Sequence, residues 1–125
     1  ISLNNLGSLF SSMKQHDIAV DLYGKCLSVW EAIIGKDNER FATTLGNIGI
    51  VYYRQKEYGS ALAYFEEALE FYAKHPEQYT DSIKSIGELA VACFYYLQQD
   101  VNVDQNELQK DLNIFKSKYA TYILN

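Results

Sequence analysis

Few residues in this sequence are of the types that carry out acid–base, nucleophilic or metal chemistry. The chain has two histidines, His16 and His75, and both fall in connections between predicted helices. A nucleophilic site built on histidine therefore has little material. No P-loop, GxGxxG, HExxH or EF-hand pattern appears in the sequence. We expect a protein that is not an enzyme, with no catalytic residue, no cofactor and no metal ligand.

The remaining reactive side chains have structural interpretations. Cys26 and Cys93 lie in apolar helical stretches without CxxC spacing, which favours buried, reduced thiols over a disulfide. Reduced thiols are typical of the cytoplasm, where we expect the protein to reside. Glu66 and Glu67 lie on a helix whose apolar face is otherwise accounted for, so we expect a solvated surface there rather than paired acid–base work.

The composition indicates a helical globular chain. Of its 125 residues, 48% are hydrophobic, one is proline and seven are glycine, so helix breakers are scarce. Acidic residues outnumber basic ones by 16 to 11, and the basic ones are scattered, so nucleic acid is excluded as a partner. No apolar run approaches the ~20 residues that cross a bilayer. The chain lacks an initiating Met and begins within a predicted helix, so we expect a fragment of a longer protein.

The sequence matches itself when it is shifted by 42 residues. Near the start of the chain, five residues fall on equivalents of similar size: Leu3, Asn5, Leu6, Gly7 and Phe10 on Leu45, Asn47, Ile48, Gly49 and Tyr52. Farther along, six more do the same: Lys14, Ala19, Tyr23, Cys26, Leu27 and Trp30 on Lys56, Ala61, Phe65, Ala68, Leu69 and Tyr72. Self-similarity at such a period predicts a stack of repeated units.

Each unit has the apolar spacing of two helices joined by a short polar turn, at Gln55-Lys56-Glu57 in the second unit. Glycine within a helix costs ~1 kcal/mol relative to alanine, so the recurrence of Gly7, Gly49 and Gly87 requires a reason. Close approach of a neighbouring helix supplies one. We expect Gly49 to face Ala61 across the hairpin, so that two small residues let the helices touch.

These positions closely resemble the tetratricopeptide repeat. The pattern of large, small and aromatic residues on its two helices is matched twice, by Leu3, Leu6, Gly7, Phe10, Ala19, Tyr23 and Cys26, and by Leu45, Ile48, Gly49, Tyr52, Ala61, Phe65 and Ala68. The resemblance implies an all-α fold, an alpha-alpha superhelix or solenoid of three helical hairpins with about six helices. It also implies a scaffold that binds proteins or peptides.

The eight residues beyond the usual 34 resemble the lengthened repeat of the kinesin light chain type. That unit has a glycine-containing connection before Ala-x-x-Leu-x-Asn-Leu, which is matched here from Gly35 to Ile48. Asn38-Glu39 stands where the family often has His-Pro. The resemblance divides the chain into a first repeat at 1–38, a second at 39–79, and a degenerate third repeat with a C-terminal capping helix at 80–125.

The third unit departs from the pattern. Ile83, Ile86 and Gly87 restart it, but the apolar run then continues to Leu97, which predicts a longer and more fully buried helix. Asp104 and Glu107 form a predicted capping box before the last helix. That helix has one apolar face, made of Leu108, Leu112, Phe115, Tyr119, Tyr122 and Ile123. We expect it to cover the end of the solenoid; docking on another domain, or self-association with a second chain, is the alternative.

The resemblance implies that the first helix of each hairpin lines a concave groove. The residues that this projection places on the groove face are Asn4, Asn5, Ser8, Ser11, Ser12, Thr43, Asn47, Ile50, Tyr53, Arg54, Asp81, Lys84, Ser85 and Glu88. Of these, the ones that we expect to bind a partner are Asn5, Ser8, Asn47, Ile50, Tyr53, Arg54, Lys84 and Glu88. Asn5 and Asn47 recur one unit apart, and an amide offers donors and an acceptor to a peptide backbone of any sequence. The alternative for these asparagines is that they bond only neighbouring helices. Asp81 would repel a carboxylate, so a chaperone carboxylate clamp is disfavoured.

Eleven tyrosines raise the question of an aromatic binding surface. Most fall on or beside predicted core stripes, where a large ring with a polar tip packs well. We expect Tyr23, Tyr52, Tyr58, Tyr64 and Tyr72 to be structural, and Trp30 as well because it matches Tyr72. Tyr53, Tyr95 and Tyr96 are left open.

Two further functions compete with the protein-binding scaffold. One is a peptide-sensing regulatory domain of a bacterial signalling protein or transcriptional regulator, which an attached kinase, phosphatase or DNA-binding domain would indicate. The other is a structural spacer whose groove stays empty and whose C-terminal helix self-associates.

Overall fold

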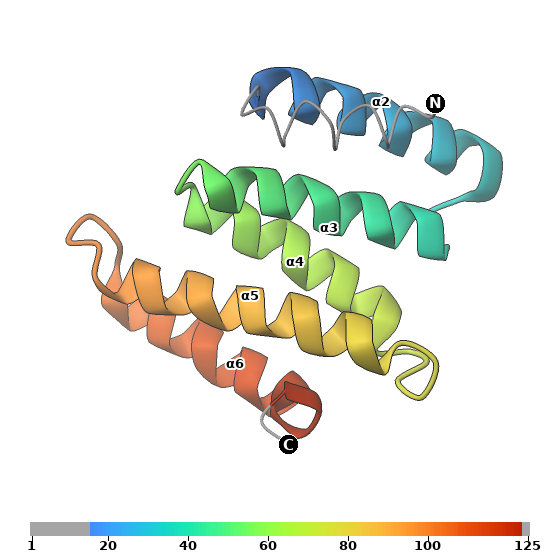
Figure 1. Ribbon diagram of the computed structural model, residues 1–125. Coiled ribbons are helices and arrows are strands. Elements are labelled where there is room, and N and C mark those ends of the chain that lie inside the picture. Colours follow the sequence, from blue (N-terminus) through green and yellow to red (C-terminus); the bar gives the residue numbers. More distant parts are fainter. Residues whose placement is uncertain (1–15, 124–125) are drawn as a thin grey trace.

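The computed structural model describes residues 16–123, and its regular structure over that range is entirely helical (Figure 1). The helices are α2 (His16–Ile34), α3 (Glu39–Arg54), α4 (Tyr58–Tyr72), α5 (Thr80–Gln98) and α6 (Gln105–Ile123). The predicted all-α class is confirmed. The earliest predicted helix, from Leu3 to Phe10, lies outside the described residues. His16 was expected in a connection, but it is the first residue of α2.

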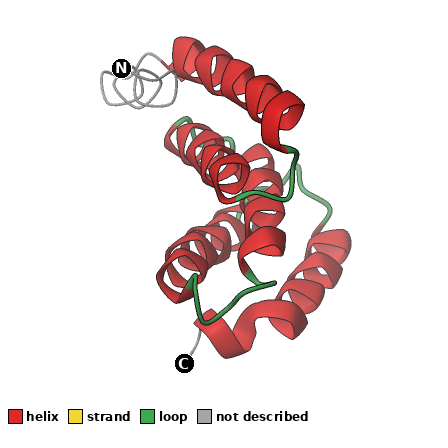
Figure 2. Cartoon of the chain, turned by 90° about the vertical axis from the view of Figure 1, so that its right-hand side faces the viewer, coloured by secondary structure: helices red, strands yellow, loops and turns green. Residues whose placement is uncertain are grey.

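The helices pack in chain order, each against the next (Figure 1). α3 and α5 run in the same direction, and α4 returns between them. Turning the molecule by 90° shows the same succession of helices from α2 to α6, joined by short loops (Figure 2). This is the stack of helical hairpins that the repeat predicts. No helix of the described part is long and apolar enough to cross a membrane.

The second helices of the first two units, α2 and α4, bury equivalent positions. Residues that match at the 42-residue offset have nearly the same small exposed fractions: Ala19 and Ala61 both 0%, Tyr23 and Phe65 2% and 0%, Cys26 and Ala68 4% and 0%. Trp30, which matches Tyr72 at the 42-residue offset, is half-buried and packs against the core. The guanidinium carbon of Arg40 lies 5.4 Å from the centroid of the Trp30 ring. The offset in the sequence therefore reflects equivalent packing in space.

The nearest atoms to Gly49 on α4 belong to Phe65, a residue that the sequence did not single out as its neighbour. A Cβ added at Gly49 would lie 2.6 Å from Cε1 of Phe65, whose ring is fully buried. The α3–α4 contact therefore joins a glycine to a ring, where the sequence suggested two small residues. The glycine is still required, because any side chain would occupy the space of the ring.

α5 is amphipathic rather than fully buried, which corrects the expectation for the third unit. Its buried residues are Ile83, Gly87, Ala90, Cys93 and Phe94. Val91, Tyr95 and Tyr96 are 40%, 58% and 41% exposed. The apolar run in the sequence continues past the core because α5 packs on α4 and α6 with one side only, and its other side stays open.

α6 covers the last hairpin with the apolar face that the sequence predicts. Leu108, Leu112, Phe115, Tyr119 and Ile123 are buried, whereas Tyr122 is 37% exposed. The Phe115 ring lies 5.4 Å from that of Phe94 on α5 and 5.0 Å from that of Tyr119, centroid to centroid. These aromatic contacts fix α6 on the end of the stack.

The helix ends have local causes. Asn38 caps α3, since its side chain accepts a hydrogen bond of 2.8 Å from the Arg40 N–H. Asp104 does the same for α6, with the N–H groups of Asn106 and Glu107 as donors. In a capping box the Glu107 side chain would in turn accept a hydrogen bond from the Asp104 N–H. Here the Glu107 carboxylate forms an ion pair with Lys110 at 3.3 Å instead.

Two turns use the left-handed backbone region. Gly35 has φ +78° and ends α2, where glycine adopts this conformation without strain. Lys56 has φ 64° and ends α3 within the predicted turn, Gln55-Lys56-Glu57. The Glu57 N–H donates to the Tyr52 carbonyl at 2.9 Å, which closes that turn.

Candidate functional site

Two of the predicted partner-binding residues, Asn47 and Ile50, line the same hollow between α3 and α5. We call it the α3–α5 groove; its volume is about 240 Å³. The other lining residues are Thr43, Gly46, Tyr72, Asp81, Ser82, Ser85 and Ile86. Polar groups lie on both helices, and Ile50 and Ile86 supply the apolar part. The groove thus unites predicted residues from two different repeats.

The groove lies where α3 and α5 approach each other beside α4. A Cβ added at Gly46 would lie 3.2 Å from Cδ1 of Ile86. On the floor, the hydroxyl groups of Thr43 and Tyr72 are hydrogen-bonded at 3.1 Å. Burial raises the pKa of Tyr72, while the bond to Thr43 lowers it. The floor is therefore polar but uncharged at neutral pH.

One end of the groove is acidic. A second hollow of about 420 Å³ shares Asp81 and Ser82 with it. Its remaining lining residues are Glu39, Glu77, Gln78, Tyr79 and Thr80. We call Glu39, Glu77 and Asp81 the acidic end. Lysine and arginine are absent from the described residues that line these two hollows.

Tyr53 lies at the opposite end of α3, within a group of four tyrosines. The centroids of the Tyr58 and Tyr96 rings are 4.4 Å apart and the rings are stacked. Tyr53 lies edge-on to both, at 5.5 Å from Tyr58 and 6.3 Å from Tyr96, and Tyr95 contacts Tyr96 at 5.5 Å. Desolvation, followed by the neighbouring Tyr96, raises the pKa of Tyr53. We call Tyr53, Tyr58, Tyr95 and Tyr96 the tyrosine cluster.

The structure does not bring every predicted residue into the groove. Lys84 and Glu88 are exposed and line neither hollow. Arg54 is exposed at the last position of α3. Asn5 and Ser8 lie outside the described residues.

Sequence analysis missed several residues of this surface. Tyr58 was assigned to the core, and Tyr96 was left open; both belong to the tyrosine cluster. Ser82 and Ile86 line the groove but were not among the predicted residues.

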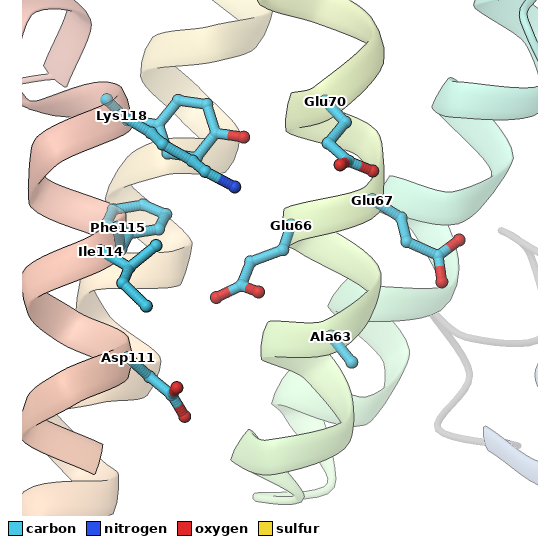
Figure 3. A pocket seen from close by; sticks show the side chains of 9 residues that line it. Ala63, Glu66, Glu67, Glu70, Asp111, Ile114, Phe115 and Lys118 are labelled. Carbon is cyan, nitrogen blue, oxygen red and sulfur yellow. The ribbon is translucent and has the colours of Figure 1, made fainter. Parts of the chain in front are cut away.

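The structure also has a cleft between α4 and α6, which the sequence did not indicate (Figure 3). We call it the α4–α6 cleft; its volume is about 330 Å³. Its lining residues are Ala63, Glu66, Glu67, Glu70, Asp111, Ile114, Phe115, Lys118 and Tyr119. The Glu66 side chain reaches from α4 toward α6, whereas Glu67 points to the other side of α4 (Figure 3).

Glu66 is therefore not the solvated surface residue that was expected. Desolvation and the charge of Asp111 raise the pKa of Glu66, Lys118 lowers it, and Glu70 raises it further. Glu67, its neighbour in the sequence, is exposed as expected. The pair is thus split between two environments by the helical turn of about 100° per residue.

The sulfur chemistry of the described residues is limited by burial. Cys26 and Cys93 are buried free thiols. Burial raises the pKa of Cys93 to about 12 and also raises that of Cys26, so the reactive thiolate form is scarce at neutral pH. No group of three or more His, Cys, Asp or Glu side chains within residues 16–123 is arranged to hold a metal ion.

Comparison with known proteins agrees with this architecture. Residues 1–74 match the tetratricopeptide repeat family. The chain is also 26% identical over 115 residues to the clustered mitochondria protein homolog of Candida albicans. That alignment covers 90% of this chain but only 8% of the relative, so the chain spans a small part of that protein's length. The family match covers more than half of the chain and includes α2, α3 and α4, and the chain accordingly belongs to the tetratricopeptide repeat family.

Proposed function

We propose that the chain is a protein-binding module of a scaffold and that the α3–α5 groove binds an extended peptide. The main support is that Asn47 lies in the same hollow as Ile50 and Ile86. A carboxamide offers two N–H donors and an acceptor, so it can bond a peptide backbone whatever the peptide sequence. The isoleucines add apolar contact. A few polar groups in a partly apolar hollow are the usual features of a binding site.

We further propose that the repeats are of the lengthened kinesin light chain type, with units at 1–38, 39–79 and 80–125. The helix starts support this division, because α3 begins at Glu39 and α5 at Thr80. In this arrangement the groove lies between the first helices of the second and third units. The partner would therefore contact two units at once.

A scaffold role is favoured over catalysis and over a bacterial peptide sensor. The described thiols are buried, and the described residues that line the α3–α5 groove include neither cysteine nor histidine. The similarity to a protein of Candida albicans favours a scaffold over a bacterial regulator. Self-association through α6 is an alternative that its exposed Ile114 and Tyr122 would permit. Sedimentation equilibrium distinguishes a monomer from a dimer.

The relative is a clustered mitochondria protein homolog, and we propose that this protein acts in the cytoplasm on the distribution of mitochondria. The support is the 26% identity over 115 residues. Fluorescence microscopy of cells that lack the protein tests this role. Collapsed or clustered mitochondria are expected, and an unchanged mitochondrial network contradicts it.

Peptide binding is tested with a random dodecapeptide library displayed on phage and selected on the chain. The double variant Asn47→Ala, Arg54→Ala should bind a selected peptide about tenfold more weakly, because it loses the amide and a charge at the far end of α3. Circular dichroism should show unchanged helicity, since Arg54 is exposed and Asn47 is half-buried.

The matched control is the double variant Asn113→Ala, Lys116→Ala on α6, which likewise removes one carboxamide and one basic side chain. Both residues are exposed and line none of the hollows described above. The control should bind like the unchanged chain. Undiminished binding by the Asn47 and Arg54 double variant would move the site away from the α3–α5 groove.

A further inference from the structure

The two ends of the α3–α5 groove differ in chemistry, and this difference specifies a ligand class. We propose that the groove recognises an extended peptide with an arginine at the acidic end and an aromatic residue, about six or seven positions away, at the tyrosine cluster. The proposal rests on the proposed function, because it names the peptides that this same groove selects.

The acidic end has no basic partner in the described structure. The ion pairs of the described residues use other carboxylates, those of Asp21, Glu31, Asp37 and Glu107. Glu39, Glu77 and Asp81 are all exposed, so a bound cation can reach them. The nearest basic residues along the helices are directed elsewhere. Arg40 lies over the Trp30 ring, and Lys84 lines neither hollow.

An arginine fits this end better than a lysine. Its planar guanidinium donates five N–H bonds in a fixed fork and pairs with two carboxylate oxygens at once. Asp81 lies in both hollows, so a guanidinium bound there lies at the mouth of the α3–α5 groove. Ser82 is also shared and supplies a neutral acceptor beside it.

The opposite end offers aromatic surface that the fold itself does not use. Tyr95 is 58% exposed and Tyr96 is 41% exposed, although both are large rings. Tyr58 and Tyr96 stack face to face. A partner can therefore contact the edges of these two rings and the ring of Tyr95. Aromatic rings pack edge-to-face or offset on such a surface. Arg54 follows Tyr53 in the chain, and its charge disfavours a second basic residue of the peptide at this end.

The two ends are connected by the apolar middle of the groove. Thr43 and Ile50 lie in the same hollow, and Tyr53 follows Ile50 by one helical turn. At 1.5 Å per residue, the path from Glu39 to Tyr53 on α3 is about 21 Å and that from Asp81 to Tyr96 on α5 is about 22 Å. An extended peptide covers about 3.4 Å per residue, so these lengths correspond to about six to seven residues.

The test uses fluorescein-labelled dodecapeptides in which one arginine and one tryptophan stand five, six or seven positions apart, in both orders, within a Ser/Gly/Ala background. Matched probes replace the arginine by glutamate or the tryptophan by alanine. Fluorescence anisotropy on the 125-residue chain measures the dissociation constants. The best arginine–tryptophan probe should bind about tenfold more tightly than either replacement.

Substitutions in the protein then assign each end. Asp81→Asn should weaken the arginine–tryptophan probe about fivefold and leave the glutamate probe unaffected. Asp81→Lys should reverse the preference in favour of glutamate. Tyr96→Ala should weaken the arginine–tryptophan probe and leave the alanine probe unchanged. Asp111→Asn, in the α4–α6 cleft, is the control and should alter none of these values.

The binding of phage-selected peptides and of the designed probes tests the peptide-binding groove and its ligand class separately. If phage-selected peptides bind through Asn47 but the arginine and tryptophan probes show no preference, the ligand class is wrong and the peptide-binding groove stands. If no peptide binds in a way that depends on Asn47, both proposals fail. Equal affinities for the arginine and glutamate probes, or indifference to Asp81→Lys, overturn the inference directly.

Discussion

Phe65 occupies the space in which a side chain at Gly49 would begin. An added Cβ would lie 2.6 Å from Cε1 and 2.7 Å from Cδ1 of the fully buried ring. Carbon atoms of side chains do not approach this closely in folded proteins, so the ring or the helix would have to move. This contact sets the separation of α3 and α4 and hence the geometry of the hairpin on which the groove is built.

The first prediction is that Gly49→Ala destabilises the chain in spite of the better helix propensity of alanine. Overpacking against Phe65 should cost about 1–3 kcal/mol of unfolding free energy. Urea denaturation followed by circular dichroism measures this change. A second substitution, Phe65→Leu, should recover part of the loss, because it removes the ring atoms that the new Cβ meets.

Gly24 is the matched control for this substitution. It also lies within a helix, but an added Cβ there would meet nothing within 4 Å. Gly24→Ala should therefore stabilise the chain by up to ~1 kcal/mol through helix propensity alone. Equal effects of the two substitutions would show that Gly49 has no special contact.

The sequence predicted the helices and their stacking because both depend on local patterns. Apolar spacing and the 42-residue offset placed Ala19, Ala61, Tyr23 and Phe65 in the core, and all four are buried. The pattern did not predict Phe65 as the nearest neighbour of Gly49, because it specifies which face of a helix is buried and not which residue of the neighbouring helix lies opposite. That choice depends on the crossing of the two helices, which is a property of the packed structure.

The second prediction concerns the attachment of α6. Phe115 is 3% exposed and contacts the rings of Phe94 and Tyr119. Phe115→Ala should lower the free energy of unfolding by about 3–5 kcal/mol, because it leaves a cavity between α5 and α6. Ile114→Ala removes a neighbouring side chain that is 55% exposed and should change stability by less than about 0.5 kcal/mol. Comparable losses for the two variants would mean that α6 packs with a different face.

The third prediction is a dependence of stability on pH that is due to Glu66. Desolvation and the charge of Asp111 raise its pKa above the ordinary value of 4.5, so the folded state binds this proton more tightly than the unfolded state does. The resulting stabilisation is complete below pH 4.5 and is lost as the pH rises through the raised value. Glu66→Gln, which stays neutral, should therefore raise the melting temperature by a few degrees at pH 7 and have little effect at pH 4.

Glu67→Gln is the control for the pH experiment, since Glu67 is the adjacent carboxylate and is exposed. It should leave the melting temperature nearly unchanged at both pH values. A Glu66→Gln variant that is destabilised at pH 7 would mean that the carboxylate makes a favourable ionic contact in the α4–α6 cleft. The packing of Glu66 against α6 would then need revision.

The binding surface was less predictable than the fold. The repeat pattern placed Asn47 and Ile50 on the groove side of α3, and both line the hollow. It could not tell that Ser82 and Ile86 line the groove whereas Lys84 and Glu88 do not. The two pairs are close in the sequence but lie on different sides of α5, and the repeat pattern of the third unit is degenerate. The tyrosine cluster depends on three helix ends that meet in space, and nothing in the local spacing indicates that meeting.

The most direct test of the peptide-binding groove is a map of amide chemical shifts on the ¹⁵N-labelled chain as a phage-selected peptide is added. The account predicts that the largest shifts gather on α3 and α5, at Asn47, Ile50, Ser85 and Tyr96. Shifts confined to α4 and α6, around Glu66 and Asp111, would place the ligand in the α4–α6 cleft and contradict it.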